Sequence, residues 1–389
     1  MRLQLAIVSE TWAPEINGVA MTLGHLVSGL REAGHRVQVV RPLQAGEKCG
    51  AGEKSSEELR LSSLPFPGYA SLRLGLPAPR RLLAEWRHRR PDWVHIVTEG
   101  PLGWSALWAA RRLGIPVSSS FHTYFDRYCQ HYRLPCLAPL LRRYLLALHR
   151  RTALTFVPTR AVAEELATQG IDGIEVMGRG CDTQRFHPTH RDNALRAQWG
   201  AEPRTLVCLY VGRLAAEKNL GLAEAAFTAI SRRHPDARMV WVGDGPARSG
   251  LMNRHPKHIF PGQLVGAALA AHYASADLFL FPSLTETYGN VVPEAMASGL
   301  PVLAFRHAAA AELIEDGING ILIEPTAAPA FIEAAGNWAQ TPARCQDLGT
   351  AATQAARDQR WQQVVERFIT PITRMLHSTK CHEAVTIEL

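Results

Sequence analysis

The stretch Ser283-Leu-Thr-Glu-Thr-Tyr-Gly-Asn-Val-Val-Pro-Glu-Ala-Met-Ala-Ser-Gly-Leu-Pro-Val302 follows the apolar run at residues 278–281, which has the length and composition of a buried strand. The chain passes Gly289 and then takes up helical spacing. Pro293 falls in the first turn of the expected helix, where its missing N–H costs least. A strand, a glycine loop and a helix N-terminus together favour a bound anion beyond the end of the strand. The stretch therefore predicts a phosphate site around residues 289–292.

Two glutamates, Glu286 and Glu294, flank this expected phosphate site. A carboxylate accepts two hydrogen bonds and can therefore hold vicinal hydroxyls of a ribose or a hexose. One glutamate on each side of the phosphates could therefore bind a sugar and a nucleoside. The alternative is that Glu294 is an ordinary first-turn acid and Glu286 a solvated loop residue, and composition alone favours it.

Outward from this stretch, apolar runs alternate with helical stretches along the whole chain. At the N-terminus, a strand over residues 3–8 precedes a helix over 19–30, which Gly34 ends, and a second strand follows. Such β-α-β units predict α/β architecture with doubly wound parallel sheets covered by helices on both faces. Further strands are expected at 94–97, 116–121, 154–157, 206–211, 239–242, 278–281 and 301–305, and helices at 102–113, 161–168, 220–231 and 267–275.

The length of 389 residues predicts two domains of similar size. A new series of alternating strands and helices begins at Thr205, after a domain boundary expected near residues 186–188. We therefore expect Rossmann-like domains over 1–186 and 187–357, facing a central cleft. A helical segment over 358–389 follows, and we expect it to return to the N-terminal domain, although its periodicity does not identify the domain on which it packs.

Several classes of protein are excluded by composition. No run of 18 apolar residues occurs, and the chain enters a strand without a basic leader, so we expect a cytoplasmic protein without a transmembrane span. Seven well-separated cysteines without a C-x-x-C pair indicate reduced thiols. No D-x-D, H-x-x-x-H or paired-cysteine motif suggests a metal, so we expect neither a metal nor another cofactor.

The net charge of +7 is concentrated in the first half of the chain. Residues 70–151 contain 14 arginines and only four acidic residues. Such a patch suits an anionic partner such as phosphates, nucleic acid or an acidic membrane surface. A solvated arginine-rich surface is the alternative. A nucleic-acid binder would leave the glutamate-flanked phosphate site without a purpose, so we expect no nucleic acid.

The E-x7-E spacing of Glu286 and Glu294 resembles the signature of retaining glycosyltransferases of the GT-B fold, family four (glycosyltransferase group 1). The segment Tyr210-Val-Gly-Arg-Leu-Ala-Ala-Glu-Lys-Asn-Leu220 resembles the one in which this family clamps the donor diphosphate, which implies that role for Arg213 and Lys218. The turn Val242-Gly-Asp-Gly-Pro246 resembles the family's nucleotide-side turn. Two cations at a strand end are also suited to neutralising a departing diphosphate, whereas in isolation they would be an ordinary surface pair.

The N-terminal half carries further motifs, so the resemblance extends over nearly the whole chain. Ser9-Glu-Thr-Trp-Ala-Pro-Glu-Ile-Asn-Gly-Val19 resembles the family's glycine loop, in which Gly18 lets the backbone approach the donor phosphate. Ser118-Ser-Ser-Phe-His-Thr-Tyr-Phe-Asp126 places His122 where relatives touch the donor hexose; a buried structural histidine is the alternative. Gly178-Arg-Gly-Cys-Asp-Thr-Gln-Arg-Phe-His-Pro188 is similar to the hinge between the two domains.

The strings F-H-T-Y-F-D and G-R-G-C-D-T resemble most closely the subgroup that includes GDP-mannose-dependent mannosyltransferases and sulfoquinovosyl- and glycosyl-diacylglycerol synthases. One departure concerns the turn Arg306-His-Ala-Ala-Ala-Ala-Glu312, where many relatives have a glycine-rich turn. This bulkier turn leaves the preferred donor sugar open.

The resemblance implies transfer of a hexose, with retention, from GDP-mannose or a UDP-hexose to a hydroxyl of a membrane lipid such as diacylglycerol or a glycolipid. The alternatives are a soluble sugar acceptor and a sugar-nucleotide epimerase of the same fold. A nicotinamide oxidoreductase is disfavoured because no G-x-G-x-x-G follows the first strand. The implied catalytic residues are His122, Arg213, Lys218 and Glu286. The implied donor-binding residues are Gly18, Gly212, Arg213, Lys218, Gly243, Gly245, Glu286, Tyr288, Gly289, Asn290, Val291 and Glu294.

The acceptor is expected in the basic half, at Asn17, Tyr124, Asp126, Arg142 and Arg143. Residues 134–151 place six apolar side chains at helical spacing, with arginines around them. A basic helix with such a stripe is typical of an interfacial membrane segment, so we expect peripheral binding to the anionic inner face of the cell membrane. The alternative is a core helix whose arginines are solvated. The stripe consists of Leu137, Leu140, Leu141, Tyr144, Leu145 and Leu148.

Overall fold

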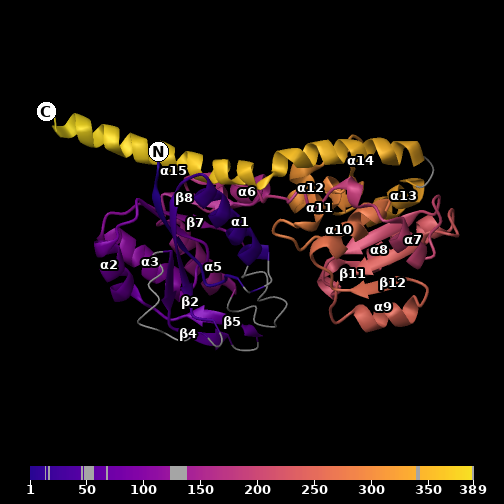
Figure 1. Ribbon diagram of the computed structural model, residues 1–389, viewed down its shortest axis with the longest axis horizontal. Helices are drawn as coiled ribbons and strands as arrows, with labels where there is room; N and C mark the ends of the chain where they lie inside the picture. The colour runs from indigo at the N-terminus through magenta and orange to yellow at the C-terminus, as the bar shows by residue number, and fades with distance from the viewer. Residues whose placement is uncertain are drawn as a thin grey trace. The chain divides into compact units, whose positions relative to one another are not determined.

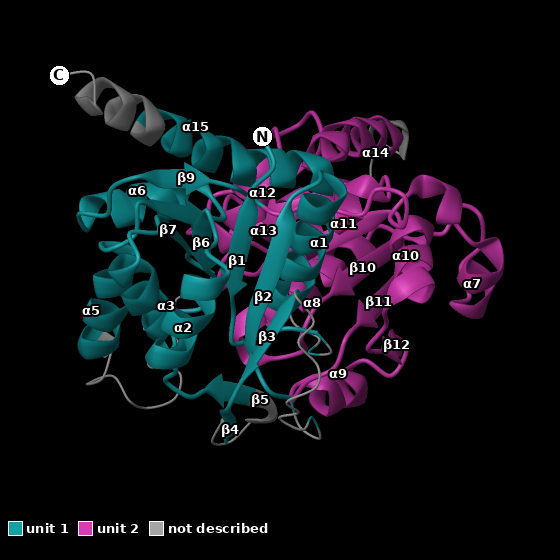
Figure 2. Cartoon of the chain, turned by 60° about the vertical axis from the view of Figure 1, so that its left-hand side comes forward, with its two compact units in different colours: residues 1–178, 361–389 teal, residues 179–360 magenta. Residues whose placement is uncertain are grey.

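The computed structural model describes residues 1–13, 15, 18–44, 47, 57–66, 69–122, 138–338 and 342–387 (Figure 1). The chain divides into two compact units. Unit 1 comprises Met1–Gly178 and Trp361–Leu389, and unit 2 comprises Arg179–Arg360 (Figure 2). The divisions fall after Gly178 and Arg360, where the sequence predicts them after residues 186 and 357.

A parallel sheet forms the centre of unit 1, with seven strands among the described residues in the order β3-β2-β1-β6-β7-β8-β9. A separate antiparallel hairpin consists of β4 (Ser63–Phe66) and β5 (Tyr69–Gly75). The sheet strands are β1 (Gln4–Val8), β2 (Arg36–Pro42), β3 (Glu58–Leu61), β6 (Trp93–Ile96), β7 (Val117–Ser120), β8 (Leu154–Val157) and β9 (Ile174–Val176).

Helices cover both faces of this sheet, and on the central strand β1 the residues on both sides are apolar. On β1, Leu5 and Ile7 pack with α1 (Gly18–Glu32) and α15 (Trp361–Ile387). The intervening Ala6 and Val8 pack on the opposite face with α2 (Pro79–His88) and α3 (Pro101–Arg112). Among the described residues of unit 1, the other helices are α5 (Ala138–His149) and α6 (Arg160–Thr168).

The long helix α15, yellow in Figure 1, belongs to unit 1 although the chain enters it from unit 2. Its buried residues include Val365, Phe368 and Ile372. Gly29 of α1 faces Val365, and any larger side chain there would overlap the valine methyl group. The His25 and Trp361 rings stack with centroids 4.5 Å apart. Close packing of α1 on α15 therefore covers one face of the sheet.

Unit 2 is built around a second parallel sheet, with six described strands in the order β12-β11-β10-β13-β14-β15. The strands are β10 (Val207–Val211), β11 (Arg238–Val242), β12 (Ile259–Gly262), β13 (Leu278–Phe281), β14 (Val302–Phe305) and β15 (Ile321–Ile323). The helices are α7 (Asn193–Gln198), α8 (Leu220–Ser231), α9 (Arg248–Arg254), α10 (Gly266–Ser275), α11 (Val291–Ala297), α12 (Ala308–Leu313), α13 (Ala328–Trp338) and α14 (Pro342–Ala356).

The second sheet is also buried on both faces. On β10, Leu209 and Val211 pack with α10, α11 and α14, while Cys208 and Tyr210 pack with α8 and α13. The two sheets confirm the predicted α/β class with two doubly wound parallel sheets. Within the described part of the chain, no helix is both long enough and apolar enough to pass through a bilayer.

The first turns of unit 2 are fixed by a buried arginine. Arg196 of α7 is 2% exposed. Its Nη1 donates to the Ser275 carbonyl oxygen at 2.7 Å and to Asp277 Oδ2 at 3.0 Å. Its Nη2 donates to the carbonyl oxygens of Glu202 and Thr205. The side chain therefore ties α7 to the segments that lead into β10 and β13.

We predict that Arg196→Met destabilises unit 2 by about 2–4 kcal/mol, because four acceptors lose their donor and Asp277 loses its buried partner. Thermal unfolding followed by calorimetry measures the effect. Arg204→Met, at an exposed arginine of the same unit, is the control and should change stability by less than about 0.5 kcal/mol. Equal melting temperatures for the two variants would contradict this role of Arg196.

Candidate functional site

The loop after β13 meets the loop after β10 at the same edge of the second sheet. Lys218 Nζ lies 2.5 Å from Glu286 Oε1, and the two side chains are 17% and 19% exposed. The Ser283 hydroxyl donates to the same glutamate oxygen at 2.9 Å. Asn219 Nδ2 also donates to the Pro282 carbonyl oxygen at 3.3 Å. Two motifs far apart in the sequence are thus joined by a half-buried ion pair.

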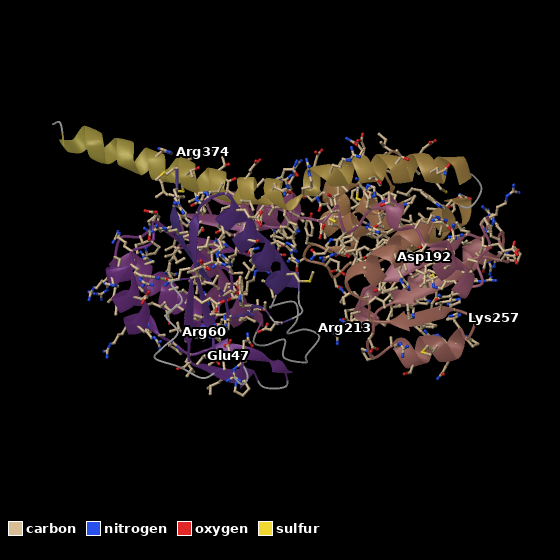
Figure 3. All side chains as sticks on the ribbon, in the orientation of Figure 1. Glu47, Arg60, Asp192, Arg213, Lys257 and Arg374 are labelled. Carbon is tan, nitrogen blue, oxygen red and sulfur yellow. The ribbon has the colours of Figure 1, made fainter. Side chains whose placement is uncertain are left out.

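Arg213 occupies a different position from Lys218 within this site. Its side chain, labelled in Figure 3, is 61% exposed. Its Nη1 lies 3.6 Å from Glu217 Oε1. An exposed arginine with a long, weak ion pair is free to change partners at little cost. Arg213 therefore offers a mobile positive charge beside the fixed Lys218–Glu286 pair.

The predicted donor-binding glycines lie in the loops that follow β10 and β11, and these loops contact each other. The Gly212 N–H donates to the Val242 carbonyl oxygen at 3.0 Å. Gly243 has φ 138°, and a Cβ atom there would overlap the carbonyl oxygen of Gly212. A Cβ atom at Gly245 would overlap the carbonyl oxygen of Leu214. These glycines allow the two strand-end loops to approach closely, which is a role that sequence alone did not assign to them.

The loop before α11 is hydrogen-bonded to Arg179. Tyr288 is 2% exposed, and its hydroxyl donates to the Arg179 carbonyl oxygen at 3.3 Å. Arg179 Nη1 donates to Asn290 Oδ1 at 3.3 Å. Gly289 has φ 90°, a backbone conformation that favours glycine. Val291 is the first residue of α11. Arg179 is a site residue that the sequence did not reveal: it stands in the quoted hinge motif, but only the fold shows its burial.

The turn after β14, which differs from the glycine-rich turn of many relatives, contacts the loop that carries Glu286 and Tyr288. His307 Nε2 lies 3.1 Å from the Glu286 carbonyl oxygen, and the Ala309 N–H donates to the Tyr288 carbonyl oxygen at 2.7 Å. Ala308 has φ 51° and begins α12. The bulkier turn therefore supports the backbone of the Glu286 loop.

Glu294 lies on α11, partly buried beside Tyr273. The Tyr273 hydroxyl donates to Glu294 Oε2 at 3.0 Å. Burial raises the pKa of Glu294 from 4.5 to about 7, while the Tyr273 hydrogen bond and the charge of Arg185 act in the opposite direction. The carboxyl group therefore titrates close to neutral pH.

In unit 1, the described candidate residues lie at three places. Gly18 is the first residue of α1, and His122 is partly buried just after β7. Arg142 and Arg143 are exposed on α5, and Arg142 pairs with Glu165 at 3.4 Å. The other acceptor candidates, Asn17, Tyr124 and Asp126, lie outside the described residues.

The apolar stripe predicted on α5 is divided between two environments. Leu145 and Leu148 are buried in the unit, at 5% and 0% exposure. Leu140 is 67% exposed and Tyr144 is 38% exposed. Leu137 lies outside the described residues. The helix is therefore both a core element and the carrier of an exposed apolar edge with adjacent arginines.

Unit 1 also gathers polar residues that the sequence did not single out, at the carboxyl ends of β1 and β6. The Leu102 N–H donates to Glu10 Oε1 at 3.1 Å, and burial raises the pKa of Glu10 to about 7, with the charge of Glu99 adding to the shift. His149 Nε2 lies 3.2 Å from Glu99 Oε1, and its Nδ1 lies 2.8 Å from Ser119 Oγ. The position of Glu10 just after the first strand was the feature of the sequence from which this polar group could have been predicted.

Among the described residues, no three His, Cys, Asp or Glu side chains are grouped so that they could hold a metal ion.

Two family models match the chain. Residues 16–185 match the model described as Glycosyltransferase Family 4, and residues 205–340 match the one described as Glycosyl transferases group 1. A GDP-mannose-dependent alpha-mannosyltransferase of Corynebacterium glutamicum is 32% identical over 368 residues, which cover 94% of this chain and 88% of the relative. The chain belongs to the group 1 glycosyltransferases.

This glycosyltransferase is also similar to the alpha-monoglucosyldiacylglycerol synthase of Acholeplasma laidlawii, at 28% identity over 82% of the chain and 84% of the relative. Among solved structures, sucrose-phosphate synthase from Thermosynechococcus elongatus matches with a TM-score of 0.74 and 19% identity, over 97% of this chain and 100% of that one. The structural likeness confirms the GT-B fold. The sequence relatives confirm the predicted family.

We predict that Glu294→Gln changes the pH dependence of stability. The unfolded carboxyl ionises near pH 4.5, and the folded one near pH 7. The stability contributed by the neutral folded form is therefore present at low pH and is lost as the pH rises through about 7. Glutamine is neutral throughout, so the stability of the variant relative to the unaltered enzyme should rise by about 2 kcal/mol from about pH 5 to about pH 8.

Urea unfolding at several pH values measures this difference. Glu333→Gln, at an exposed glutamate on α13, provides the control and should show no comparable trend. A constant difference between Glu294→Gln and the unaltered enzyme across the range would mean that Glu294 ionises normally in the folded state.

Proposed function

We propose that this glycosyltransferase transfers a hexose from GDP-mannose or a UDP-hexose to an acceptor hydroxyl with retention of the anomeric configuration. The observation that carries the proposal is the 2.5 Å pair between Lys218 and Glu286. One partner belongs to the segment expected to hold the diphosphate, and the other to the segment expected to hold the hexose. Their contact supports a site in unit 2 in which the diphosphate and the hexose of the donor are bound side by side.

The pair also suggests how Glu286 is oriented. Both contacts that described residues make to its carboxylate, from Lys218 and Ser283, end on Oε1. Oε2 is then directed to the hydroxyls of the hexose, and His122 makes the second hexose contact. Glu294 binds the ribose hydroxyls.

The diphosphate is bound by Arg213, by Lys218 and by the backbone near Gly18 and Asn290. The bond between the anomeric carbon and the diphosphate oxygen breaks, while the acceptor oxygen bonds to that carbon from the same face. The acceptor proton passes to the departing phosphate oxygen, so no separate protein nucleophile is needed. Charge that develops on the diphosphate is stabilised by the two cations, and we propose that no metal or other cofactor takes part.

We further propose that the acceptor belongs to a membrane lipid such as diacylglycerol or a glycolipid. Leu140 and Tyr144 are exposed on α5, and Tyr144 adjoins α3, because its ring lies 5.5 Å from that of Trp104. Trp108 on α3 is 40% exposed, with the Arg112 guanidinium 5.2 Å from its ring centroid. Apolar and aromatic side chains among arginines suit an anionic bilayer surface. The similarity to a diacylglycerol-glycosylating relative supports the same acceptor class.

A panel of nucleotide sugars, read by release of nucleoside diphosphate, tests the proposed function. We expect turnover with GDP-mannose or a UDP-hexose only when lipid extract is present. Turnover with a soluble sugar alone would replace the lipid acceptor. Free sugar formed without any acceptor would indicate an epimerase, and inactivity with every donor and acceptor would contradict the proposal.

We predict that Arg213→Ala and Lys218→Ala each lower kcat by about 10²–10³, because each removes a charge aimed at the leaving diphosphate. Lys257→Ala, at an exposed lysine of unit 2, is the matched control and should leave kcat unchanged. A chelator should have little effect on the unaltered enzyme. Loss of activity on chelation, restored by a divalent ion, would show that a metal stabilises the leaving group instead.

We predict that the enzyme binds vesicles containing anionic lipid, and that rising salt weakens binding by screening. Reversing two charges on α5, with Arg142→Glu and Arg143→Glu together, should reduce vesicle binding. The control makes the same change in charge on unit 2, with Arg204→Glu and Lys257→Glu. Sedimentation with vesicles measures both. Full activity on lipid without any vesicle binding would show that α5 is only a structural helix.

A further inference from the structure

Arg179 is a buried cation directly behind the loop that carries the E-x7-E motif. Its side chain belongs to a residue that is only 8% exposed. Nη1 donates to Asn290 Oδ1 at 3.3 Å, and the guanidinium carbon lies 5.8 Å from the centroid of the Tyr288 ring. Nε has no hydrogen-bond partner among the described residues. The guanidinium therefore lies against the Tyr288–Asn290 segment with part of its donor capacity unused.

The position of Arg179 is fixed by its neighbours in unit 2. Its carbonyl oxygen accepts the Tyr288 hydroxyl. Two residues further along, the Cys181 N–H donates to the Gln359 carbonyl oxygen at 2.7 Å, and the Cys181 thiol donates to the Pro293 carbonyl oxygen at 3.5 Å. The segment is thus attached both to the start of α11 and to the end of the unit.

Arg179 differs from the other buried arginines in the described part of the chain because those form ion pairs with carboxylates. Arg41 pairs with Glu47 at 2.8 Å and with Glu58 at 3.1 Å. Arg196 pairs with Asp277 at 3.0 Å. No described carboxylate lies within ion-pair distance of Arg179. Burial lowers the pKa of Arg179 and the charge of Glu286 raises it, but that carboxylate is already paired with Lys218. An arginine stays protonated at neutral pH, and a buried charge without a partner is costly, so an anion that arrives with a ligand would supply the missing counter-charge.

We propose that Arg179 is a positioning residue of the donor site, which holds Asn290 in place and stabilises the diphosphate of the bound nucleotide with its unpaired charge. This inference rests on the proposed function. It adds a third cation whose role differs from those of the other two, since Lys218 is already paired with Glu286 and Arg213 is exposed at the surface. Arg179 provides charge that water and salt screen least, because it lies within the unit.

The alternative is that Arg179 only keeps the loop folded. The two roles of Arg179, in charge and in loop folding, predict different effects on ligands with and without phosphates. Loss of charge weakens binding of a diphosphate and leaves a nucleoside unaffected. Loss of loop structure weakens binding of both, because the ribose contact at Glu294 follows the same loop.

The experiment measures, by calorimetry, the affinity of Arg179→Gln and Arg179→Lys for UDP and GDP and for uridine and guanosine. Arg204→Gln is the matched surface control. We expect Arg179→Gln to bind the preferred diphosphate about 10–100-fold more weakly and the matching nucleoside within about twofold of the unaltered enzyme. Arg179→Lys should recover part of the loss, because it keeps the charge but not the bond to Asn290.

Thermal melting establishes that each variant is folded, and Arg179→Lys carries the comparison if the glutamine variant does not fold. Equal weakening of nucleoside and diphosphate, or unchanged diphosphate affinity in a folded variant, would overturn the role of Arg179 while leaving the proposed function intact. If the unaltered enzyme binds neither diphosphate, the proposed function itself fails, and this inference fails with it.

Discussion

Parallel strand pairing is the constraint on which the rest of the structure depends. Because β10, β11 and β13 run in the same direction, the loops that follow them emerge at one edge of the second sheet. The strands are apolar on both faces, so helices cover those faces and only the edge is left for polar chemistry. Lys218 and Glu286 meet at that edge, and the close contact between Gly212 and Gly243 holds the loops after β10 and β11 together.

The buried charges of this protein are compensated to different degrees. Arg196 is surrounded by acceptors and serves the fold. In the candidate site, Lys218 pairs closely with Glu286, and the exposed Arg213 pairs only weakly with Glu217. The buried Arg179 has no described carboxylate within ion-pair distance. Burial raises the pKa of Glu294 to about 7, which favours the neutral form of this carboxyl group. An anionic ligand that bound only to the folded enzyme and neutralised a cation such as Arg179 would also stabilise the fold.

The sequence predicted much of the fold, because apolar runs reveal strands that are buried on both faces. Even Ser118–Ser120, polar in every side chain, fell within an expected strand. The antiparallel hairpin β4–β5 and the short strand β9 carried too little periodicity to be expected. At the site, motif residues such as Lys218 and Glu286 could be proposed in advance, but their contact could not. Arg179 and Glu10 went unnoticed because burial and missing partners depend on distant segments, which composition does not encode.

The assignment of α15 to unit 1 has a consequence for biosynthesis. The residues of unit 2 are contiguous, so its core can close as soon as residue 360 has left the ribosome. Unit 1 begins first but finishes last: Leu5 and Ile7 on β1 wait for Val365, Phe368 and Ile372 to cover their face of the sheet. Until then, an apolar surface of the nascent chain stays open to chaperones, and the order of folding is the reverse of the order of synthesis.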